Sequence, residues 1–317
     1  MPLDPFLVPL VANLPPVPEQ IDDFPAFRAQ DSAGAAVMVE QFTEPGPPVR
    51  SRRTVAIPVD GGNIDLKIFH PEGDGPHPAH LYIHGGGWIS GTIHSPYIDI
   101  TCQERCAGAD CVVVTVEYRK APEHQFPTGL NDCHAALTWM FEHADELGIQ
   151  IDRVSVGGGS AGANLAAALC LKLRDEDGPK LALQLLEVPA LDLTLASPSV
   201  HRNATGYGLD LTTIEQLLPY YLPAPEDATH PYASPLLASD LSGLPPAYIM
   251  SAEYDPLCDD GQRYADRLTE AGVDATFSLQ KGHIHVSSAL TKVMPSARDW
   301  RTEMIAALNN ANVGLTR

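Results

Sequence analysis

The sequence is short of basic residues and has no long hydrophobic run. Lysine and arginine number 20 against 40 aspartates and glutamates, which gives a formal net charge of −20 at pH 7. Nucleic acids and anionic membranes bind clustered Lys and Arg, so we expect neither as a partner. No stretch approaches the ~18 uninterrupted apolar residues of a membrane-spanning helix. We therefore expect no stable insertion into a membrane.

Signals for export and for disulfide bonding are also missing. The apolar stretch Phe6–Val11 has no basic region before it, and Asp4 and several prolines interrupt it, which is atypical of a signal peptide. No Cys-x-x-Cys pair occurs, and Cys102 and Cys106 alone are too few for a zinc site. We expect a cytoplasmic protein without a bound metal, in which all six cysteines are buried free thiols: Cys102, Cys106, Cys111, Cys133, Cys170 and Cys258.

A regular alternation of strand and helix patterns is present instead. Strand patterns lie at residues 54–57, 64–69, 79–84, 111–116, 153–156, 183–188, 247–251 and 275–279. Helix patterns lie at residues 24–42, 96–107, 128–147, 161–174, 259–271 and at the C-terminal end. The first two strands are joined by a turn sequence and predict a β-hairpin. The remaining alternation predicts an α/β protein, with a mostly parallel central sheet and helices on both faces.

Two segments fall outside this alternation. Residues 1–50 are rich in proline and alanine, so we expect an N-terminal arm and not an independent domain. Residues 194–235 show no strand pattern but contain several aromatic and apolar side chains, and long insertions of this kind are usually lids or binding loops. We expect a catalytic domain over residues 51–317, with a cap formed by the insertion and the arm.

The turn around Ser160 is the first candidate for chemistry. A β-branched strand pattern runs into three glycines, the serine and an alanine-rich helix pattern. The motif Gly158-x-Ser160-x-Gly162 places a serine on a sharp strand-to-helix turn, where small neighbours let the backbone fold back. A glycine-rich turn with an incidental serine, or a phosphate-binding turn, would show the same pattern.

A serine nucleophile needs a base and an acid that orients the base. Asp255 follows the seventh strand pattern, at the carboxyl end where open α/β sheets build their sites. Glu253, Asp259 and Asp260 lie nearby, and the last two precede a helix pattern, where capping is their expected role. We assign the acid to Asp255.

Two candidate bases follow the last strand pattern, in the sequence Gly282-His283-Ile284-His285. A lone histidine is more often structural than catalytic, but these follow the serine and the aspartate in the chain order of α/β-hydrolases. The residues themselves leave His283 and His285 as alternatives.

An ester-cleaving serine also needs donors for the oxyanion that forms on the carbonyl oxygen. Gly85-Gly86-Gly87 follows a strand pattern and offers backbone amides without side chains in front of them. The flanking His84 and Trp88 complete a His-Gly-Gly-Gly pattern. The amide of Ala161, after the serine, is a further expected donor.

These motifs together resemble the hormone-sensitive lipase family of α/β-hydrolase esterases, the bacterial group called family IV. The resemblance covers about residues 55–290. It implies the α/β-hydrolase fold with a helical cap. It rests on seven motifs in one order: His84-Gly-Gly-Gly-Trp88, Tyr118-Arg-Lys-Ala-Pro-Glu123, Gly158-Gly-Ser-Ala-Gly162, Ser234-Pro-Leu236, Leu244-Pro-Pro246, Glu253-Tyr-Asp-Pro-Leu257 and Gly282-x-x-His285.

The resemblance implies roles that the residues alone leave open. The histidine of Gly-x-x-His is the base in this family, which selects His285, and the amides come from the second and third glycines, Gly86 and Gly87. Two positions depart from the family pattern. Gly159 replaces the usual aspartate before the serine, from which we expect altered local hydrogen bonding. His283 replaces an apolar or small residue, and it could tune the base, line the pocket or face solvent as a spectator.

The sequence therefore predicts a carboxylesterase for short- to medium-chain esters. Its expected partner is a small ester molecule, and it needs no cofactor. The sequence leaves the oligomeric state open, and a homodimer is one alternative because related esterases often pair. The expected catalytic residues are Ser160, Asp255 and His285, the oxyanion donors Gly86, Gly87 and Ala161, and the pocket residues His84, Trp88 and Gly159.

Other functions would use the same residues. A lactonase, an amidase or a deacetylase of a bulky ester needs the same nucleophile, base and acid. A non-catalytic ligand-binding protein on a hydrolase scaffold is the alternative from another class, because a fold alone does not fix a function.

Overall fold

The computed structural model describes residues 2–13, 18 and 20–313, and its centre is one mixed sheet. In these residues the sheet has eight strands in the order β1-β2-β4-β3-β5-β6-β7-β8. The strands are β1 (Ser51–Val59), β2 (Gly62–His70), β3 (His77–Ile83), β4 (Val112–Val116), β5 (Ile149–Gly159), β6 (Leu183–Glu187), β7 (Ala247–Tyr254) and β8 (Ala275–Ile284).

The sheet is mostly parallel, as the alternation of strands and helices predicts. Strands β1 and β2 form the expected antiparallel hairpin, and β2 also runs antiparallel to β4. All the other neighbours are parallel. Every residue of β4 is buried, which suits a strand covered on both faces. The carboxyl ends of the parallel strands meet at one edge, where sites in such sheets are built.

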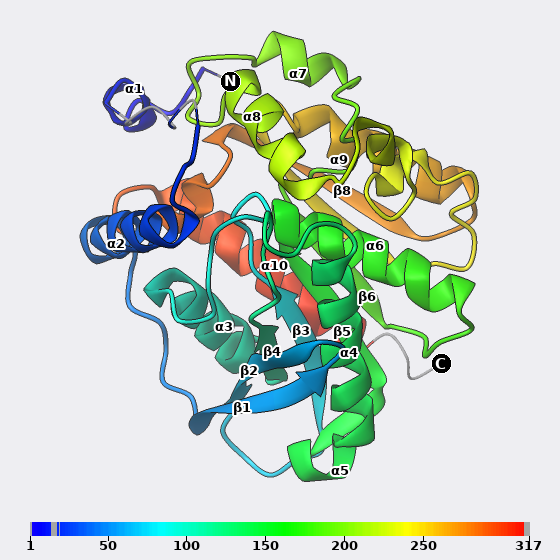
Figure 1. Ribbon diagram of the computed structural model, residues 1–317. Coiled ribbons are helices and arrows are strands. Elements are labelled where there is room, and N and C mark those ends of the chain that lie inside the picture. Colours follow the sequence, from blue (N-terminus) through cyan, green and yellow to red (C-terminus); the bar gives the residue numbers. More distant parts are fainter. Residues whose placement is uncertain (1, 14–17, 19, 314–317) are drawn as a thin grey trace.

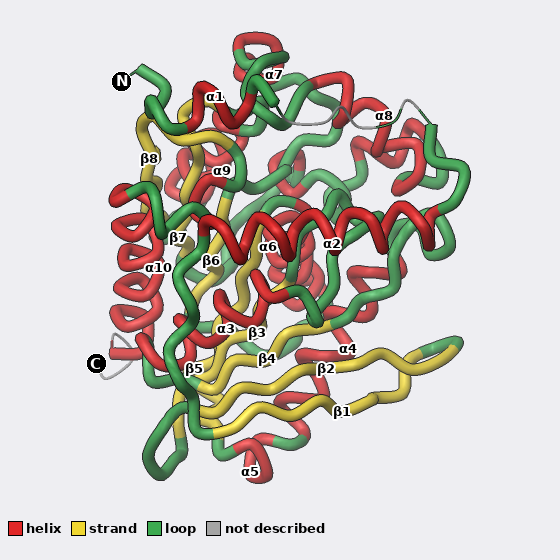
Figure 2. Tube along the Cα trace, turned by 90° about the vertical axis from the view of Figure 1, so that its left-hand side faces the viewer, coloured by secondary structure: helices red, strands yellow, loops and turns green. Residues whose placement is uncertain are grey.

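Helices cover both faces of the sheet (Figures 1 and 2). The helices α3 (Pro96–Gly108) and α10 (Pro295–Val313) pack together on one face. The helices α4 (Thr128–Glu142), α6 (Ala161–Asp175) and α9 (Cys258–Glu270) cover the other. Successive residues of a strand serve the two faces in turn, so Leu81 packs with the second group and Tyr82 with the first.

One predicted helix is wrong at its end. The sequence predicts a single helix over residues 128–147, but the structure breaks it after α4, and α5 (Ala144–Leu147) follows separately. The break lies at His143, whose ring stacks on Trp139 and whose Nδ1 bonds the Trp139 carbonyl oxygen at 2.9 Å. A side chain that bonds a carbonyl of the preceding turn competes with the helix ladder. Gly148 ends α5 in the left-handed conformation, as expected.

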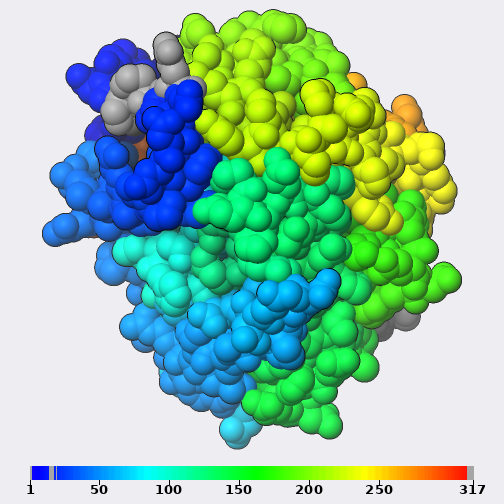
Figure 3. Space-filling model, in the orientation of Figure 1, coloured from blue at the N-terminus to red at the C-terminus, as the bar shows by residue number. Residues whose placement is uncertain are grey.

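The two segments outside the alternation contain helices and short 3₁₀ turns. They are α1 (Leu7–Val11) and α2 (Phe24–Phe42) in the arm, and α7 (Pro198–Arg202), α8 (Leu211–Tyr221), η1 (Pro225–Thr229) and the first residue of η2 (Pro235–Leu237) in the insertion; η3 (Ser287–Ala289) lies elsewhere, after β8. The Phe24 and Tyr220 rings lie 4.9 Å apart, and the Ile21 amide donates to the Tyr220 hydroxyl at 3.2 Å. Figure 3 shows the blue arm against the yellow-green insertion. The division into a body and a two-part cap stays a prediction.

Two further expectations concern the whole molecule. All six cysteines are free and buried. Within residues 2–13, 18 and 20–313, no helix has both the length and the apolar character to cross a membrane.

Asn164 on α6 holds the segments around the insertion together. It is fully buried, and its Nδ2 donates to the carbonyl oxygens of Ala190 and Ala233, both at 2.8 Å. Its Oδ1 accepts from the indole Nε1 of Trp88 at 3.3 Å. One side chain thus ties α6 to the chain after β6, to the chain before η2 and to the loop after β3.

We expect Asn164→Ala to lower the free energy of unfolding by about 3 kcal/mol, because it leaves two carbonyls and an indole N–H buried without partners. Urea denaturation measures this change. Asn131→Ala is the matched control, since Asn131 is exposed on α4 and should change stability by less than about 0.5 kcal/mol. Equal denaturation midpoints for the two variants would contradict the role given to Asn164.

Candidate active site

Ser160 lies between the end of β5 and the start of α6, in a backbone conformation that few side chains adopt. Its φ is 57° and its ψ is −120°. The Ser160 amide donates to the carbonyl oxygen of Glu187 on β6 at 2.8 Å, and the Ser160 carbonyl accepts from the Asn164 amide at 3.0 Å. A non-glycine residue at positive φ is strained and persists only where its surroundings hold it, which is a recurrent feature of functional sites.

The glycines around Ser160 differ in how much space a side chain would have at each position. A Cβ on Gly158 would lie 2.3 Å from the carbonyl oxygen of Ile83, and one on Gly162 would lie 2.1 Å from the same atom. Strand β3 therefore passes directly against the turn. A Cβ on Gly159 would meet only the Tyr82 hydroxyl, at 3.8 Å. Close packing requires Gly158 and Gly162 but not Gly159.

The structure brings the three expected catalytic side chains into one chain of hydrogen bonds. Asp255 is fully buried in the loop after β7, and its Oδ2 lies 2.6 Å from His285 Nδ1. His285 Nε2 lies 2.8 Å from Ser160 Oγ. A carboxylate only accepts, so Nδ1 carries the proton and donates, and Nε2 is left to accept from the serine hydroxyl. This arrangement can activate a hydroxyl for attack on an acyl carbon.

The neighbouring carboxylates have other partners. Glu253 accepts from the amide of Gly282 at 2.8 Å, and Asp259 forms an ion pair with Arg202. Asp260 is buried and accepts from the amide of Leu191, at the start of the chain that leads into the insertion. These contacts support the choice of Asp255 as the acid next to the base.

His283 is not a solvent-facing spectator, because it is 1% exposed. Its Nδ1 lies 2.8 Å from Ser287 Oγ, and its ring packs edge-on against Trp300. Ser287 Oγ also bonds the amide and the carbonyl of Ile284. His283 therefore stabilises the turn that carries His285, and burial lowers its pKa so that the neutral imidazole is favoured.

The glycine loop after β3 packs directly on the serine turn. A Cβ on Gly85 would lie 2.8 Å from the Gly159 carbonyl oxygen and 3.4 Å from Ser160 Cβ. Gly86 and Gly87 have φ values of 123° and 57°, a region that glycine adopts readily. Ala161 is the first residue of α6, where the backbone amide has no acceptor within the helix. The three expected oxyanion donors therefore belong to two segments that meet at Ser160.

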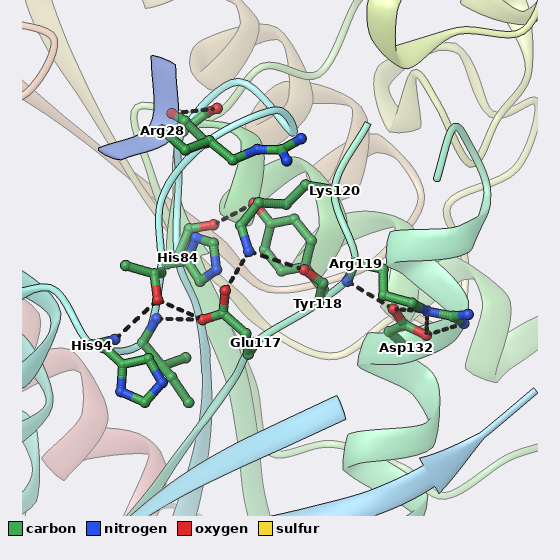
Figure 4. Close-up of polar contacts among 12 residues, drawn as sticks. Arg28, His84, His94, Glu117, Tyr118, Arg119, Lys120 and Asp132 are labelled. Carbon is green, nitrogen blue, oxygen red and sulfur yellow. Dashed lines mark hydrogen bonds and ion pairs between the residues drawn. The ribbon is translucent and has the colours of Figure 1, made fainter. Parts of the chain in front are cut away.

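A partly buried polar network supports this loop (Figure 4). Glu117 accepts from the Ile93 amide at 2.7 Å and pairs with Lys120. The Tyr118 hydroxyl donates to the His84 carbonyl oxygen at 3.1 Å, and the two rings stack. Burial, with a smaller contribution from Lys120, lowers the pKa of His84 to about 4, so its ring is neutral. The role of His84 is therefore to hold the backbone of the loop, and not to exchange a proton.

The arm also holds the loop. Arg28 on α2 donates to the carbonyl oxygens of Ile89 at 2.7 Å and Ala121 at 2.8 Å, and it pairs with Glu123. Figure 4 places Arg28 above the network around Glu117. The motif that contains residues 118–123 therefore supports the oxyanion loop rather than the reacting groups.

A cavity of about 530 Å³ opens at Ser160 and His285. The three pocket residues expected from the sequence, His84, Trp88 and Gly159, all line it. The insertion contributes an apolar wall of Leu195, Leu209, Ile214 and Leu217.

Sequence reasoning missed four lining residues with polar groups, namely Tyr82, Tyr97, Glu187 and Trp300. Glu187 ends a parallel strand, so its position offered a signal. Tyr82 lies inside a strand, and Trp300 lies on the C-terminal helix, where no motif marks either.

Comparisons with known proteins agree with this geometry. Residues 80–288 match the family model described as the alpha/beta hydrolase fold. The chain is 40% identical over 237 residues to the carboxylesterase NlhH of Mycobacterium tuberculosis, covering 74% of each protein. It is 36% identical over 266 residues to an arylesterase of Saccharolobus solfataricus, covering 84% of this chain and 86% of the relative. A solved hyperthermophilic esterase of Pyrobaculum calidifontis superposes with a TM-score of 0.91 at 32% identity, covering 98% and 99% of the two chains.

We expect Gly158→Ala to lower the free energy of unfolding by about 3 kcal/mol, because the new methyl group overlaps the Ile83 carbonyl oxygen. Gly159→Ala is the adjacent control, and it should change stability by less than about 0.5 kcal/mol because its methyl group meets no atom closer than 3.8 Å. Thermal or urea unfolding of both variants measures the difference. If Gly159→Ala were the more damaging, the packing at this turn would be misassigned.

Proposed function

Because this chain belongs to the α/β-hydrolase-fold family, in its hormone-sensitive-lipase-like group, we propose that it is a carboxylesterase that uses Ser160, His285 and Asp255. The observation that carries the proposal is the pair of hydrogen bonds of 2.6 and 2.8 Å that links the Asp255 carboxylate through His285 to the Ser160 hydroxyl. Relatives named as carboxylesterase and arylesterase support the same reaction class.

The reaction proceeds in two halves. Ser160 Oγ attacks the ester carbonyl carbon while His285 Nε2 takes the hydroxyl proton, and the carbonyl oxygen becomes an oxyanion. When the tetrahedral intermediate collapses, the ester C–O bond breaks and His285 returns the proton to the leaving alcohol. Water then attacks the acyl-enzyme by the same route, and the carboxylic acid leaves with Ser160 restored.

The surrounding charges favour this cycle. The amides of Gly86, Gly87 and Ala161 are the proposed donors to the oxyanion, and a fixed donor of this kind typically contributes about 3 kcal/mol. Asp255 accepts from the amide of Leu257 at 2.9 Å, which holds its carboxylate while it stabilises the imidazolium of His285. The cycle needs no cofactor.

The pocket supports short- to medium-chain substrates. A cavity of about 530 Å³ holds an acyl chain and a small alcohol together, and the wall from the insertion is apolar. Lactones, amides and bulky acetyl esters would meet the same Ser160 and His285. A substrate panel that varies acyl length and leaving group separates these reactions.

Two further expectations stay proposals. Six buried free cysteines support a reducing compartment such as the cytoplasm. A homodimer is proposed from the family, and light scattering of the purified chain tests it.

We expect Ser160→Ala to fold normally and to lower kcat for p-nitrophenyl butyrate by about 10⁴- to 10⁶-fold, because it removes the nucleophile. Steady-state kinetics with matched circular dichroism measures this. Turnover near the wild-type rate would contradict the proposal. A ligand-binding protein without catalysis would instead show no turnover in either form and no labelling of wild-type Ser160 by a fluorophosphonate.

We expect Asp255→Asn to lower kcat by about 10⁴-fold, because the amide cannot hold the imidazole in the required tautomer. Asp259→Asn is the control, since Asp259 pairs with Arg202 at the surface and does not contact His285 among the described contacts. It should keep kcat within about twofold, given the small effect of exposed ion pairs. A larger loss in Asp259→Asn than in Asp255→Asn would reassign the acid.

A further inference from the structure

The cavity is also lined by four residues that carry polar groups and lie outside the insertion. We define the polar wall as Tyr82 on β3, Tyr97 on α3, Glu187 at the end of β6 and Trp300 on α10. It is built from the sheet and from the two helices α3 and α10, which pack on one face of the sheet (Figure 1). The lining of the cavity therefore includes hydroxyl, carboxylate and indole side chains as well as the apolar side chains of the insertion.

The charge of this wall is already balanced. Glu187 forms an ion pair with Arg105 on α3, and both side chains are buried, at 6% and 3% exposure. The Arg105 guanidinium also lies 4.3 Å from the centre of the Tyr82 ring. Because the pair is neutral as a whole, the wall does not select for a charged substrate group.

Hydrogen-bonding capacity at the wall is not balanced. The Trp300 indole Nε1 is buried and has no partner among the described residues, although Trp300 is only 1% exposed. An indole nitrogen can only donate. Two nitrogens of Arg105, Nε and Nη1, are likewise without a partner in the described part of the chain. All three nitrogens are fully buried, so a molecule in the cavity does not reach them. The Tyr82 hydroxyl, which lies beside Gly159, is the donor of this wall that a substrate can meet.

Gly159 leaves the wall open beside the nucleophile. A Cβ at this position would lie 3.8 Å from the Tyr82 hydroxyl, and no other heavy atom lies as near. Gly159 is also the direct neighbour of Glu187 in the sheet. A larger side chain here would cover the Tyr82 hydroxyl, so the glycine next to Ser160 has a consequence for the pocket, although the turn itself does not require it.

We propose that the Tyr82 hydroxyl of the polar wall donates a hydrogen bond to an oxygen acceptor carried by the substrate, an ether, carbonyl or hydroxyl oxygen. This inference rests on the proposed esterase function. It assigns the protein to oxygen-bearing esters in preference to plain alkyl esters of the same length. Glu187 and Arg105 act as positioning residues that hold the wall.

Two isosteric ester pairs test the inference. In the first, p-nitrophenyl 3-methoxypropanoate is compared with p-nitrophenyl pentanoate, which places the oxygen on the acyl side. In the second, 2-methoxyethyl acetate is compared with butyl acetate, which places it on the alcohol side. The measured quantity is the ratio of kcat/KM within each pair. Comparing this ratio between wild type and variants cancels the intrinsic reactivity of the esters.

We expect Tyr82→Phe to lower the ratio of one pair by about fivefold, the size expected for one lost hydrogen bond. Tyr221→Phe is the matched control. The Tyr221 hydroxyl is buried and without a partner in the described residues, and Tyr221 does not line the cavity, so its ratios should stay within about twofold. The pair that responds tells which side of the ester the wall binds.

Unchanged ratios in Tyr82→Phe, with hydrolysis retained, would overturn the inference and leave the esterase proposal standing. Absence of hydrolysis of all four esters by the wild type would instead count against the esterase proposal. Tyr82→Phe loses only the hydroxyl, so we expect this variant to fold.

Discussion

The close approach of strand β3 to the turn at Ser160 is the constraint on which the rest of the structure depends. The Ile83 carbonyl oxygen occupies the space where side chains at Gly158 and Gly162 would lie. Ser160 is therefore held at a φ of 57°, with its hydroxyl directed toward His285. The same approach brings the glycine loop after β3 next to the serine. Packing at one point thus fixes both the nucleophile and the segment that offers the oxyanion donors.

The surrounding elements keep this point rigid. Glu117 and Tyr118 bond the segments on either side of the glycine loop, and Arg28 attaches the arm to the same loop. On the other side, His283 and Ser287 stabilise the turn of His285. Catalysis of this kind requires the reacting groups to be placed to within a fraction of an ångström. The polar networks beneath the loops contribute to function because they fix these positions.

Much of the fold and of the site was predictable from the sequence, because both depend on local patterns in chain order. Strands and helices alternate with clear periodicity, and Ser160, Asp255 and His285 follow one another as in α/β-hydrolases. The predictions from the sequence were wrong where individual side-chain contacts determine the structure. The helix break at His143 depends on a side-chain bond to Trp139, and the burial of His283 depends on Trp300.

The Arg105–Glu187 pair joins residues 82 positions apart, and no local pattern marks such a contact. Tyr82, Glu187 and Trp300 of the polar wall lie far apart in the sequence, and only the fold brings them to one cavity.

The most direct test of the central claim is to trap the acyl-enzyme and locate the acyl group. Wild-type protein mixed with excess p-nitrophenyl butyrate and quenched in acid within the first turnovers is digested and analysed by mass spectrometry. The account predicts a butyryl group on the peptide that contains Ser160. A butyryl group on another residue, or hydrolysis without any acylated peptide under conditions where the intermediate accumulates, would contradict it.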